Sequence, residues 1–499
     1  MGKEYELNRK KKILIRIITI LLVFSLIPFP VLADEGWDGN TETQPQGTGT
    51  ADDPYLIGTP EELAWYRSEI NYYNNQACAK LTADIDLNNK PWTPIGQTIT
   101  GQSSNAFAGE FDGGGYTICG LFVEHLRLSS SVNIDYGFFG TVKGVSSTVR
   151  ASIHDLNLIG IVIHEQIAYV SATKGDAGGL CGHASNADIY GCTINVSVIV
   201  IEPDSVYGTP ASAGGICGRA SGVNITDCIN YGDIKGSGSA GGLVGSGNAS
   251  LIRCANYGNI EAGKGFAGGF LGYMKAHNGN ESMTIRYCYN TGDVISTGKK
   301  DEDGEITIDM NAGGNAGGFI GYASFSNKNK LQYSFSHCFS TGTVSAPLHA
   351  GSIAGVLWDY ATKTPSISFT DIVCLDISCS KVFGTNVNQT DIPLVVTTKT
   401  AEEMSSADYV TALNESAGYE LFAAGDSCPV FKWLADAPSF KPGDINGDDM
   451  VDEQDVTLLI GHVLGLDILD SDSAAAADLN NDTYIDENDV TLLIQMVLP

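Results

Sequence analysis

The sequence predicts a mainly β protein built as a parallel β-helix, or solenoid, followed by a small calcium-binding domain. Three observations predict this. A Gly-Gly-x-x-Gly unit recurs through the middle of the chain, a segment containing cysteine and asparagine follows most units, and an acidic 12-residue pattern occurs twice near the C-terminus. The 499 residues are enough for more than one hydrophobic core.

The glycine units set the period of the predicted solenoid. They begin at Gly178, Gly214, Gly241, Gly268 and Gly317, and weaker copies span 137–140 and 351–355. The shortest spacing is 27 residues, which fits one coil of two or three short strands, and longer spacings indicate loop insertions. Equivalent strands of stacked coils lie about 4.8 Å apart. Glycines at fixed positions are expected to allow positive φ at the corners.

Stacking places like residues above one another. One column consists of Asn230, Asn256 and Asn290, and we expect it to hydrogen-bond along itself. Two cysteine columns are expected to point inward and pack as small apolar groups. Their members are Cys181 and Cys217 in one column, and Cys192, Cys228, Cys254, Cys288 and Cys338 in the other. Parallel Cβ vectors disfavour disulfides, so mostly reduced thiols are predicted. The alternative is that some neighbours pair.

Residues 1–33 have the pattern of a secretory signal, with a basic start, an apolar stretch and a cleavage point after Ala33. The alternative is an uncleaved membrane anchor. No later stretch approaches the ~18 apolar residues of a spanning helix. Removing the signal leaves 22 basic and 56 acidic side chains, a net charge of −34. Such a surface repels phosphate backbones, which disfavours nucleic acid as a partner.

Residues 34–50 are polar and rich in Gly and Thr, which predicts a flexible leader. A short helix is expected next. Thr59 can cap its N-terminus, Pro60 fits the first helical position, and Glu62 would complete a capping box. Its apolar side is expected to consist of Leu63, Tyr66 and Ile70.

Residues 51–435 resemble the GLUG-motif repeat proteins of bacterial surfaces. The glycine units carry this resemblance, together with lead-in motifs at 63–65, 81–87, 92–96 and 107–118 and a closing strand at 428–433. The resemblance implies a right-handed β-helix with a capping helix. It implies little about chemistry, because the family is defined by a structural repeat.

Residues 442–499 contain 14 acidic residues and no Lys or Arg. Oxygen ligands at positions 1, 3, 5, 9 and 12 of a 12-residue loop, with a main-chain carbonyl at position 7, suit Ca²⁺. Two copies, 34 residues apart, predict two calcium ions. The expected ligands are Asp444, Asn446, Asp448, Met450, Asp452 and Asp455 in the first loop, and Asp478, Asn480, Asp482, Tyr484, Asp486 and Asp489 in the second. Each loop runs into a helix beginning Asp-Val-Thr-Leu-Leu-Ile.

This pair of loops resembles a type I dockerin, with residues 436–441 as the linker before it. The resemblance implies a small all-α domain that holds two Ca²⁺ ions and binds a cohesin module of a scaffold protein. Such assemblies are extracellular and typically degrade polysaccharide, as in cellulosomes. The cohesin contacts implied by the family are Glu453, Gln454, Ile460, Gly461, Glu487, Asn488, Ile494 and Gln495.

Two classes of function stay open for the β-helix. It is either non-catalytic, as a spacer, an adhesin or a surface that binds polysaccharide or a cell-surface glycan, or it is a carbohydrate-active enzyme such as a glycoside hydrolase or polysaccharide lyase. No catalytic residues are identified in the sequence. Residues 175–179 resemble a serine-protease motif, but Ala177 occupies the nucleophile position. The non-catalytic class is favoured, because no acid/base signature is recognisable.

Overall fold

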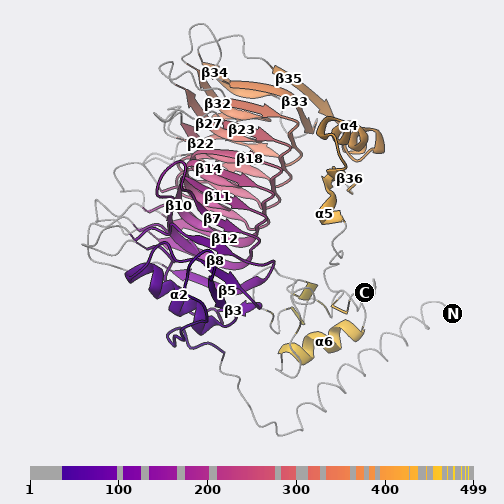
Figure 1. Ribbon diagram of the computed structural model, residues 1–499. Helices are drawn as coiled ribbons and strands as arrows, with labels where there is room; N and C mark the ends of the chain where they lie inside the picture. The colour runs from indigo at the N-terminus through magenta and orange to yellow at the C-terminus, as the bar shows by residue number, and fades with distance from the viewer. Residues whose placement is uncertain are drawn as a thin grey trace, which may run out of the picture. The chain divides into compact units, whose positions relative to one another are not determined.

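Figure 1 shows a computed structural model of the chain. The structure describes residues 36–97, 105–124, 134–165, 175–201, 211–275, 283–298, 313–325, 333–359, 367–375, 381–387, 394–425, 427–435, 445–446, 453–463, 469, 476–477, 485, 489–490 and 493. The predicted signal at 1–33 and linker at 436–441 lie outside them. The chain divides into two compact units. Residues 36–431 form one, and the residues from Lys432 onward belong to the other.

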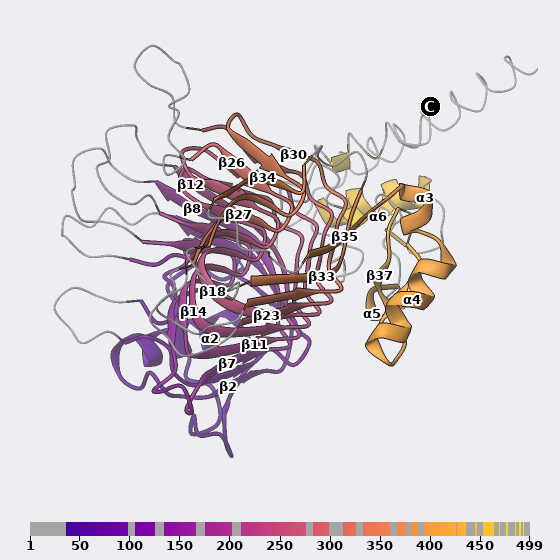
Figure 2. The same ribbon diagram turned by 90° about the horizontal axis from the view of Figure 1, so that it is seen from above.

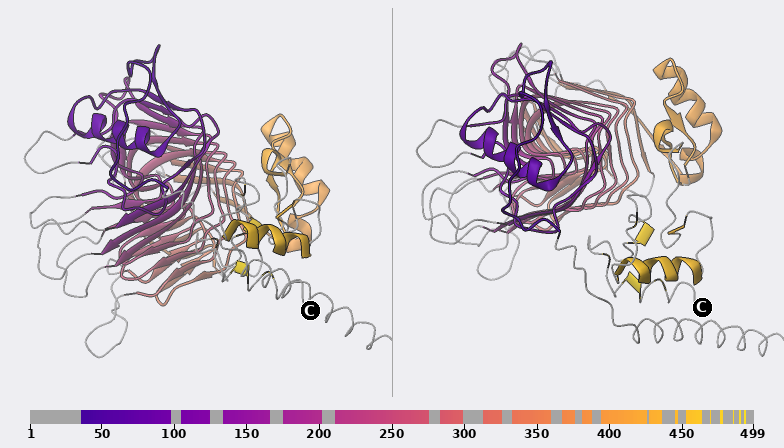
Figure 3. Two further views of the ribbon diagram at one scale, coloured as in Figure 1. Left: turned by 90° about the horizontal axis from the view of Figure 1, so that it is seen from below. Right: turned by 60° about the horizontal axis from the view of Figure 1, so that its bottom comes forward.

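Residues 36–431 contain the predicted parallel β-helix, whose coils stack around a common interior (Figure 3). The strands of its first face pair in parallel from coil to coil. They are β6 (Phe139–Lys143), β10 (Cys181–Ser185), β14 (Cys217–Thr226), β18 (Val244–Ile252), β22 (Leu271–Lys275), β27 (Ile320–Phe325), β32 (Ala354–Asp359) and β34 (Phe383–Val387).

Strands β14 and β18 extend from the first face into the second. The other strands of the second face stand before the corner that leads to the third face. They are β1 (Tyr55–Ile57), β2 (Ala79–Leu81), β4 (Glu110–Asp112), β7 (Ala151–His154), β11 (Ala187–Tyr190), β23 (Met283–Arg286), β28 (Tyr333–Ser336), β33 (Ile367–Leu375) and β35 (Leu394–Lys399).

The third face follows that corner. Its strands are β3 (Ile85–Asp86), β5 (Thr117–Glu124), β8 (Asn157–Glu165), β12 (Thr193–Ile201), β15 (Ile229–Asn230), β16 (Ile234–Gly236), β19 (Ala255–Asn256), β20 (Ile260–Ala262), β24 (Tyr289–Asn290), β25 (Val294–Ser296), β29 (Phe339–Ser340) and β30 (Val344–Ser345). Strand β12 shows why they form: Ile194, Val196, Val198 and Val200 are buried and alternate with outward residues.

A narrow face completes each coil and forms a separate six-stranded sheet. Its strands are β9 (Ala177–Gly178), β13 (Ala213–Gly214), β17 (Ala240–Gly241), β21 (Phe266–Gly268), β26 (Asn315–Gly317) and β31 (His349–Gly351). The first glycine of each unit pairs with that of the next coil. This pairing confirms the register predicted from the glycine spacing.

The reason predicted for the repeated glycines is wrong. None of Gly241, Gly242 and Gly245 has a positive φ. They are required by close packing instead. A Cβ on Gly241 would lie 2.0 Å from the carbonyl oxygen of Val244, and one on Gly242 would lie 2.4 Å from the side-chain Cγ of Asn256.

The left-handed conformation occurs at the corner between the second and third faces. There it recurs once per coil, mostly on residues with side chains. This corner column consists of Asp155, Gly191, Asp227, Arg253, Tyr287, His337 and Asp371. A buried residue follows each member, usually a cysteine.

The asparagine column forms the predicted ladder. Asn230, Asn256 and Asn290 are fully buried and stack in register, and Ser340 occupies the same position in the coil after Asn290. Asn230 Nδ2 donates to Asn256 Oδ1 at 2.8 Å, and Asn256 Nδ2 donates to Asn290 Oδ1 at 2.7 Å. Each Nδ2 also donates to the carbonyl two residues on, which fixes the turn beside it.

The cysteine columns point inward as predicted. All eleven cysteines that the structure describes are free, and nine of them are buried. The Sγ atoms of Cys181 and Cys217 lie 3.1 Å apart in neighbouring coils. Cys228, Cys254 and Cys338 bring their Sγ atoms near carbonyl oxygens of the coil wall.

Helix α2 (Pro60–Tyr72) lies at the N-terminal end of the β-helix (Figures 1 and 3). Thr59 caps it, and the predicted apolar residues are buried. The capping box differs from the prediction, because the Glu62 carboxylate accepts from the N–H of Gly58. Residues of the predicted leader segment, 34–50, contact this end of the β-helix from Gly36 onward. Trp37 is buried and its ring lies edge-on to that of Trp92.

A return segment, residues 400–431, packs on the outside of the second and third faces (Figure 2). It holds α3 (Ala401–Met404), α4 (Ala407–Ala417) and an antiparallel pair, β36 (Phe422–Ala423) and β37 (Val430–Phe431). The predicted closing strand therefore pairs within the return segment and not with a coil. Phe422 and Phe431 pack on Tyr289, and the hydroxyl of Tyr287 donates to the carbonyl of Ser416 at 2.7 Å.

The C-terminal unit contains α5 (Lys432–Ala435) and α6 (Glu453–Val463). Among the residues that the structure describes, no helix combines the length and the apolar character needed to span a bilayer.

We predict that Asn256→Ala destabilises the protein by about 2–3 kcal/mol, because Asn290 Oδ1 loses a buried donor and the Gly258 carbonyl loses another. Asn256→Asp should cost more, since a carboxylate cannot donate to either oxygen. Midpoints of denaturant unfolding measure both effects. Asn259→Ala, which removes only an exposed hydrogen bond from the N–H of Asp293, is the control and should cost no more than about 1 kcal/mol. Equal stability of Asn256→Asp and the parent would contradict the ladder.

Candidate functional site

Two parts of the chain gather functional side chains: the acidic repeats of the C-terminal unit and one side of the β-helix. In the C-terminal unit, Asp455 lies in the first turn of α6 and is fully buried. Its Oδ1 accepts from the backbone N–H groups of Ile445 and Asn446, at 2.7 and 3.1 Å. The start and the end of the first acidic loop therefore meet, as a loop that wraps one ion requires.

The two acidic repeats share one hydrophobic cluster. Val456, Leu459 and Ile460 of α6 pack with residues of the second repeat. The rest of the cluster is Ile445, Ala476, Ala477 and Leu493. Each repeat covers the apolar side of the other, which explains why two copies occur together.

The electrostatics of this unit favour a bound cation. Asp455 and Asp489, the last positions of the two loops, are both fully buried. A buried carboxylate is costly unless opposite charge and hydrogen bonds compensate it. Residues 442–499 contain 14 acidic residues and no Lys or Arg, so a bound cation would offset the net negative charge of this segment. Hard oxygen ligands of this kind suit Ca²⁺, so the described residues fit the expected ion.

Most of the predicted ligands and contacts lie outside the described residues. The structure places Asn446, Asp455 and Asp489, but not Asp444, Asp448, Met450, Asp452, Asp478, Asn480, Asp482, Tyr484 or Asp486. Of the expected cohesin contacts, Gln454 is exposed, whereas Ile460 and Gly461 are buried. Glu453 begins α6. Glu487, Asn488, Ile494 and Gln495 lie outside the described residues.

On the β-helix, two columns of side chains border the narrow face, and together we call them the polar–aromatic strip. One column stands two residues before the first glycine of each unit, and the other directly follows the last glycine. The first consists of Asp135, Asp176, Ser212, Ser239, Phe266, Asn315 and His349, and the second of Thr141, His183, Arg219, Ser246, Tyr273, Tyr322 and the buried Val356.

The N-terminal end of the strip is charged. Arg219 Nε donates to Asp176 Oδ2 at 2.6 Å, and the N–H of Ser212 donates to Asp176 Oδ1 at 2.9 Å. Asp135 accepts from the Thr141 hydroxyl at 2.9 Å and from the N–H of Asp176 at 3.2 Å. Burial raises the pKa of the Asp135 carboxyl more than nearby His183 lowers it, and the charge of Asp176 raises it further.

The strip becomes aromatic towards its C-terminal end. The Ser212 hydroxyl donates to Ser246 at 2.8 Å, and beyond them Phe266 packs against Tyr273 and Tyr322. The centroids of the Phe266 and Tyr322 rings are 4.7 Å apart. Phe266 and Tyr273 keep part of their rings exposed. Aromatic side chains beside a few polar groups are a common lining of ligand-binding sites.

Sequence reasoning missed this strip, although a signal was present. Asp176 is part of the glycine-rich motif at 175–179, and nothing in the local sequence connects it with His183 or Asp135. Aligning the residues that flank the glycine units would have placed Asp135 and Asp176 in one column. The copy at 137–140 is one residue shorter than the others, which hides this alignment.

Comparison with known proteins identifies the C-terminal segment. Residues 442–498 match the family model of the dockerin type I domain. A protein of Evansella cellulosilytica, provisionally described as a Gly-rich membrane protein, is 32% identical over 181 residues. That match covers 34% of this chain and 19% of the relative's length.

A solved structure from Bacteroides ovatus, provisionally described as an immunoglobulin A1 protease, matches with a TM-score of 0.42 at 19% identity. The match covers 78% of this chain and 94% of that one. The family match and the buried carboxylates agree on the C-terminal segment. Residues 442–498 are a dockerin type I domain, a module that binds calcium and implies a cohesin-bearing partner.

Proposed function

We propose that this protein is secreted and docks through its dockerin onto a cohesin scaffold, presenting a non-catalytic β-helix that binds glycan in an extracellular polysaccharide-degrading complex. The observation that carries the proposal is the buried Asp455, whose carboxylate closes the first acidic loop within a dockerin segment. The β-helix is right-handed, as parallel crossovers nearly always are. Its coils belong to the GLUG-motif repeat type.

The dockerin holds two Ca²⁺ ions, one in each acidic loop. Asn446 and Asp455 are ligands of the first ion, and Asp489 is a ligand of the second. The ions supply the positive charge that residues 442–499 lack. The exposed side chain of Gln454, next to Asp455, belongs to the cohesin-binding surface, with Glu453 and the equivalent residues Glu487 and Asn488 of the second repeat.

The polar–aromatic strip is the glycan-binding surface of the β-helix. Phe266 and Tyr273 offer partly exposed rings on which a sugar can stack, and the neighbouring hydroxyl and charged groups can hydrogen-bond to its hydroxyls. The column spacing of about 4.8 Å per coil repeats these groups along the axis, as suits an extended chain.

A second function is favoured by the carboxylate pair at the charged end of the strip. Asp135 has a raised pKa, and Asp176 is ion-paired with Arg219. Two carboxyl groups in such different environments are the usual acid/base arrangement of enzymes that cleave glycosidic bonds. The β-helix would then be a glycoside hydrolase or lyase of the same complex.

We predict that Asp455→Asn weakens calcium binding while the fold of residues 36–431 is unchanged. The amide oxygen still accepts from Ile445 and Asn446, so the substitution removes mainly the charge that binds the ion. Calorimetric titration of the full chain with Ca²⁺ measures the loss. Asp449→Asn, at a non-ligand position of the same loop, is the matched control. Equal affinity of Asp455→Asn and the parent would show that Asp455 is not a ligand.

We predict that the full-length protein binds cohesin modules tightly in Ca²⁺ and loses binding in excess chelator, because the domain core forms around the ions. Calorimetric titration with a panel of cohesins measures this, and a double variant Asp444→Ala/Asp478→Ala should behave like the chelated protein. Bound Ca²⁺ without affinity for any cohesin would leave a calcium-stabilised tail and contradict the docking function.

We predict that Tyr273→Ala and Phe266→Ala weaken binding to soluble plant polysaccharides in affinity electrophoresis, because the exposed rings are lost. Tyr72→Ala, which removes an exposed ring on α2, is the control and should bind as the parent does. Release of new reducing ends or unsaturated products by the parent, abolished in Asp176→Asn, would establish the enzyme instead of the binding module. Equal binding by all variants would remove the strip from the function.

A further inference from the structure

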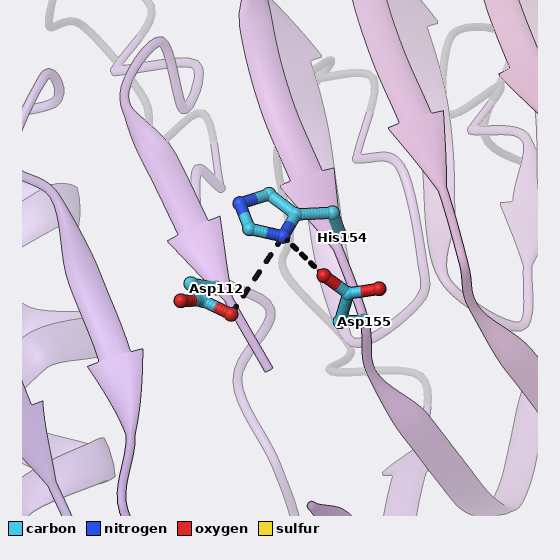
Figure 4. Close-up of side chains that lie close together, drawn as sticks. All are labelled: Asp112, His154 and Asp155. Atoms are coloured by element: carbon cyan, nitrogen blue, oxygen red, sulfur yellow. Dashed lines mark hydrogen bonds and ion pairs between the residues drawn. The ribbon is translucent and has the colours of Figure 1, made fainter. Parts of the chain in front are cut away.

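A second cluster of side chains lies at the start of the corner column and shares no residue with the polar–aromatic strip. Asp112 ends β4, His154 ends β7, and Asp155 follows as the first member of the corner column. Asp112 and His154 are register partners in neighbouring coils. Figure 4 shows that both carboxylates face the same ring nitrogen of His154.

The spacing of the three groups fits a metal ion. His154 Nδ1 lies 2.9 Å from Asp155 Oδ2 and 3.6 Å from Asp112 Oδ1. One ligand atom from each residue lies within 4.8 Å of the other two. Around a tetrahedral ion with bonds of about 2.0–2.2 Å, neighbouring ligand atoms are roughly 3–3.6 Å apart. The two distances from His154 Nδ1 lie at or close to that separation, and the two carboxylate oxygens lie within 4.8 Å of each other.

Two carboxylates face His154 Nδ1, and a metal ion satisfies both of them better than a single hydrogen bond does. A ring nitrogen can carry one proton, which serves one acceptor well, whereas two carboxylates converge on it. His154 Nε2 faces a third carboxylate, Glu110 Oε1, at 3.3 Å. A proton on Nε2 that is donated to Glu110 leaves the Nδ1 lone pair free for a metal, the arrangement found around many metal-bound histidines.

The surroundings hold these ligands in place. Asp112 Oδ2 accepts from Lys80 Nζ at 2.7 Å, and Asp112 Oδ1 accepts from the N–H of Gly114 at 2.8 Å. The imidazole ring stacks on Tyr190, with centroids 4.6 Å apart and planes within 2°. A Cβ on Gly191 would lie 2.4 Å from Asp155 Oδ1, so a glycine there makes room for the carboxylate.

Other members of the corner column satisfy their charges differently. Asp227 is paired with Arg253 through two contacts of 2.6 Å. At His337, one oxygen of the Asp371 carboxylate lies 3.6 Å from Nδ1. The positive charge of nearby Arg286 partly offsets the negative charge of that carboxylate. Around His154 lie the carboxylates of Glu110, Asp112 and Asp155, and Lys80 pairs with Asp112, so this part of the corner carries a local excess of negative charge.

We propose that Asp112 Oδ1, His154 Nδ1 and Asp155 Oδ2 bind a divalent metal ion of the Zn²⁺ class. One imidazole with two carboxylates suits a borderline ion better than Ca²⁺, which prefers oxygen alone. The ion joins the coils of β4 and β7. The Asp155 side chain is half exposed, so a remaining coordination position faces solvent.

The test uses the full-length chain with its dockerin saturated in excess Ca²⁺. Co²⁺ is titrated while its visible absorption is followed, and Zn²⁺ is then added to displace it. We expect one Co²⁺ per chain beyond the calcium, with a spectrum typical of nitrogen and oxygen ligands. Zn²⁺ should abolish that spectrum at about one equivalent.

Variants locate the ion. Asp155→Asn, which keeps the shape and suits the left-handed conformation, should lose the Co²⁺ spectrum. Asp371→Asn, in the same conformation at the equivalent place beside His337, is the matched control and should keep it. Glu110→Gln should weaken Zn²⁺ binding by about 10- to 100-fold, as loss of a partner behind a metal-bound histidine typically does. Circular dichroism verifies that each variant is folded.

Three results would overturn the proposal. The first is the absence of a further ion in the calcium-saturated protein, which would leave an imidazolium–carboxylate network. The second is a Co²⁺ spectrum that persists in Asp155→Asn. The third is an intense near-ultraviolet charge-transfer band, which would place the ion on a cysteine.

Discussion

The narrow Ala-Gly face of the β-helix packs so closely against the rest of each coil that there is no room for a side chain at its repeated glycines. A Cβ on Gly242 would collide with the side chain of Asn256, and one on Gly245 would lie 2.5 Å from the carbonyl oxygen of Ala213 in the preceding coil. This close approach buries the asparagine column, whose amides donate to one another and to backbone carbonyls. The coil shape, the ladder and the register of the surface columns all follow from it.

The periodic parts of the fold could be predicted from the sequence because each residue's neighbour is its own equivalent. The glycine pairing, the Asn230–Asn256–Asn290 ladder and the inward cysteines needed only the spacing of the repeat. The return segment has no such period and was not predicted, although Thr400 and Glu403 form a capping box that signals a helix start. The sequence predicts the left-handed conformation at glycines, because residue propensity favours glycine there. It cannot show that the stacking of coils imposes this conformation on Arg253 or Tyr287.

The candidate sites follow the same division. The acidic repeats are local in sequence, so the calcium loops could be recognised from spacing alone. Asp135 with Asp176, and Asp112 with His154, are about 40 residues apart in the chain and meet only through stacking. The first coils are the least regular, and there the register had to come from the structure. The candidate site residues of the solenoid are therefore not part of its repeated motif. The calcium ligands predicted for the dockerin, in contrast, are the repeated residues themselves.

The return segment has a mechanical consequence for the solenoid. A stack of coils that touch only their neighbours can fray from an exposed end, one coil at a time. Residues 400–431 contact successive coils at once: the Tyr419 hydroxyl interacts with Arg253, Ser416 with Tyr287, and Phe422 with Phe339. These coils can open only together with the segment that spans them, so the C-terminal half of the solenoid behaves as one cooperative block. The C-terminal unit begins directly after Phe431, the last residue of the return segment. A force applied to the chain through the dockerin therefore acts first on the return segment and only then on the coils.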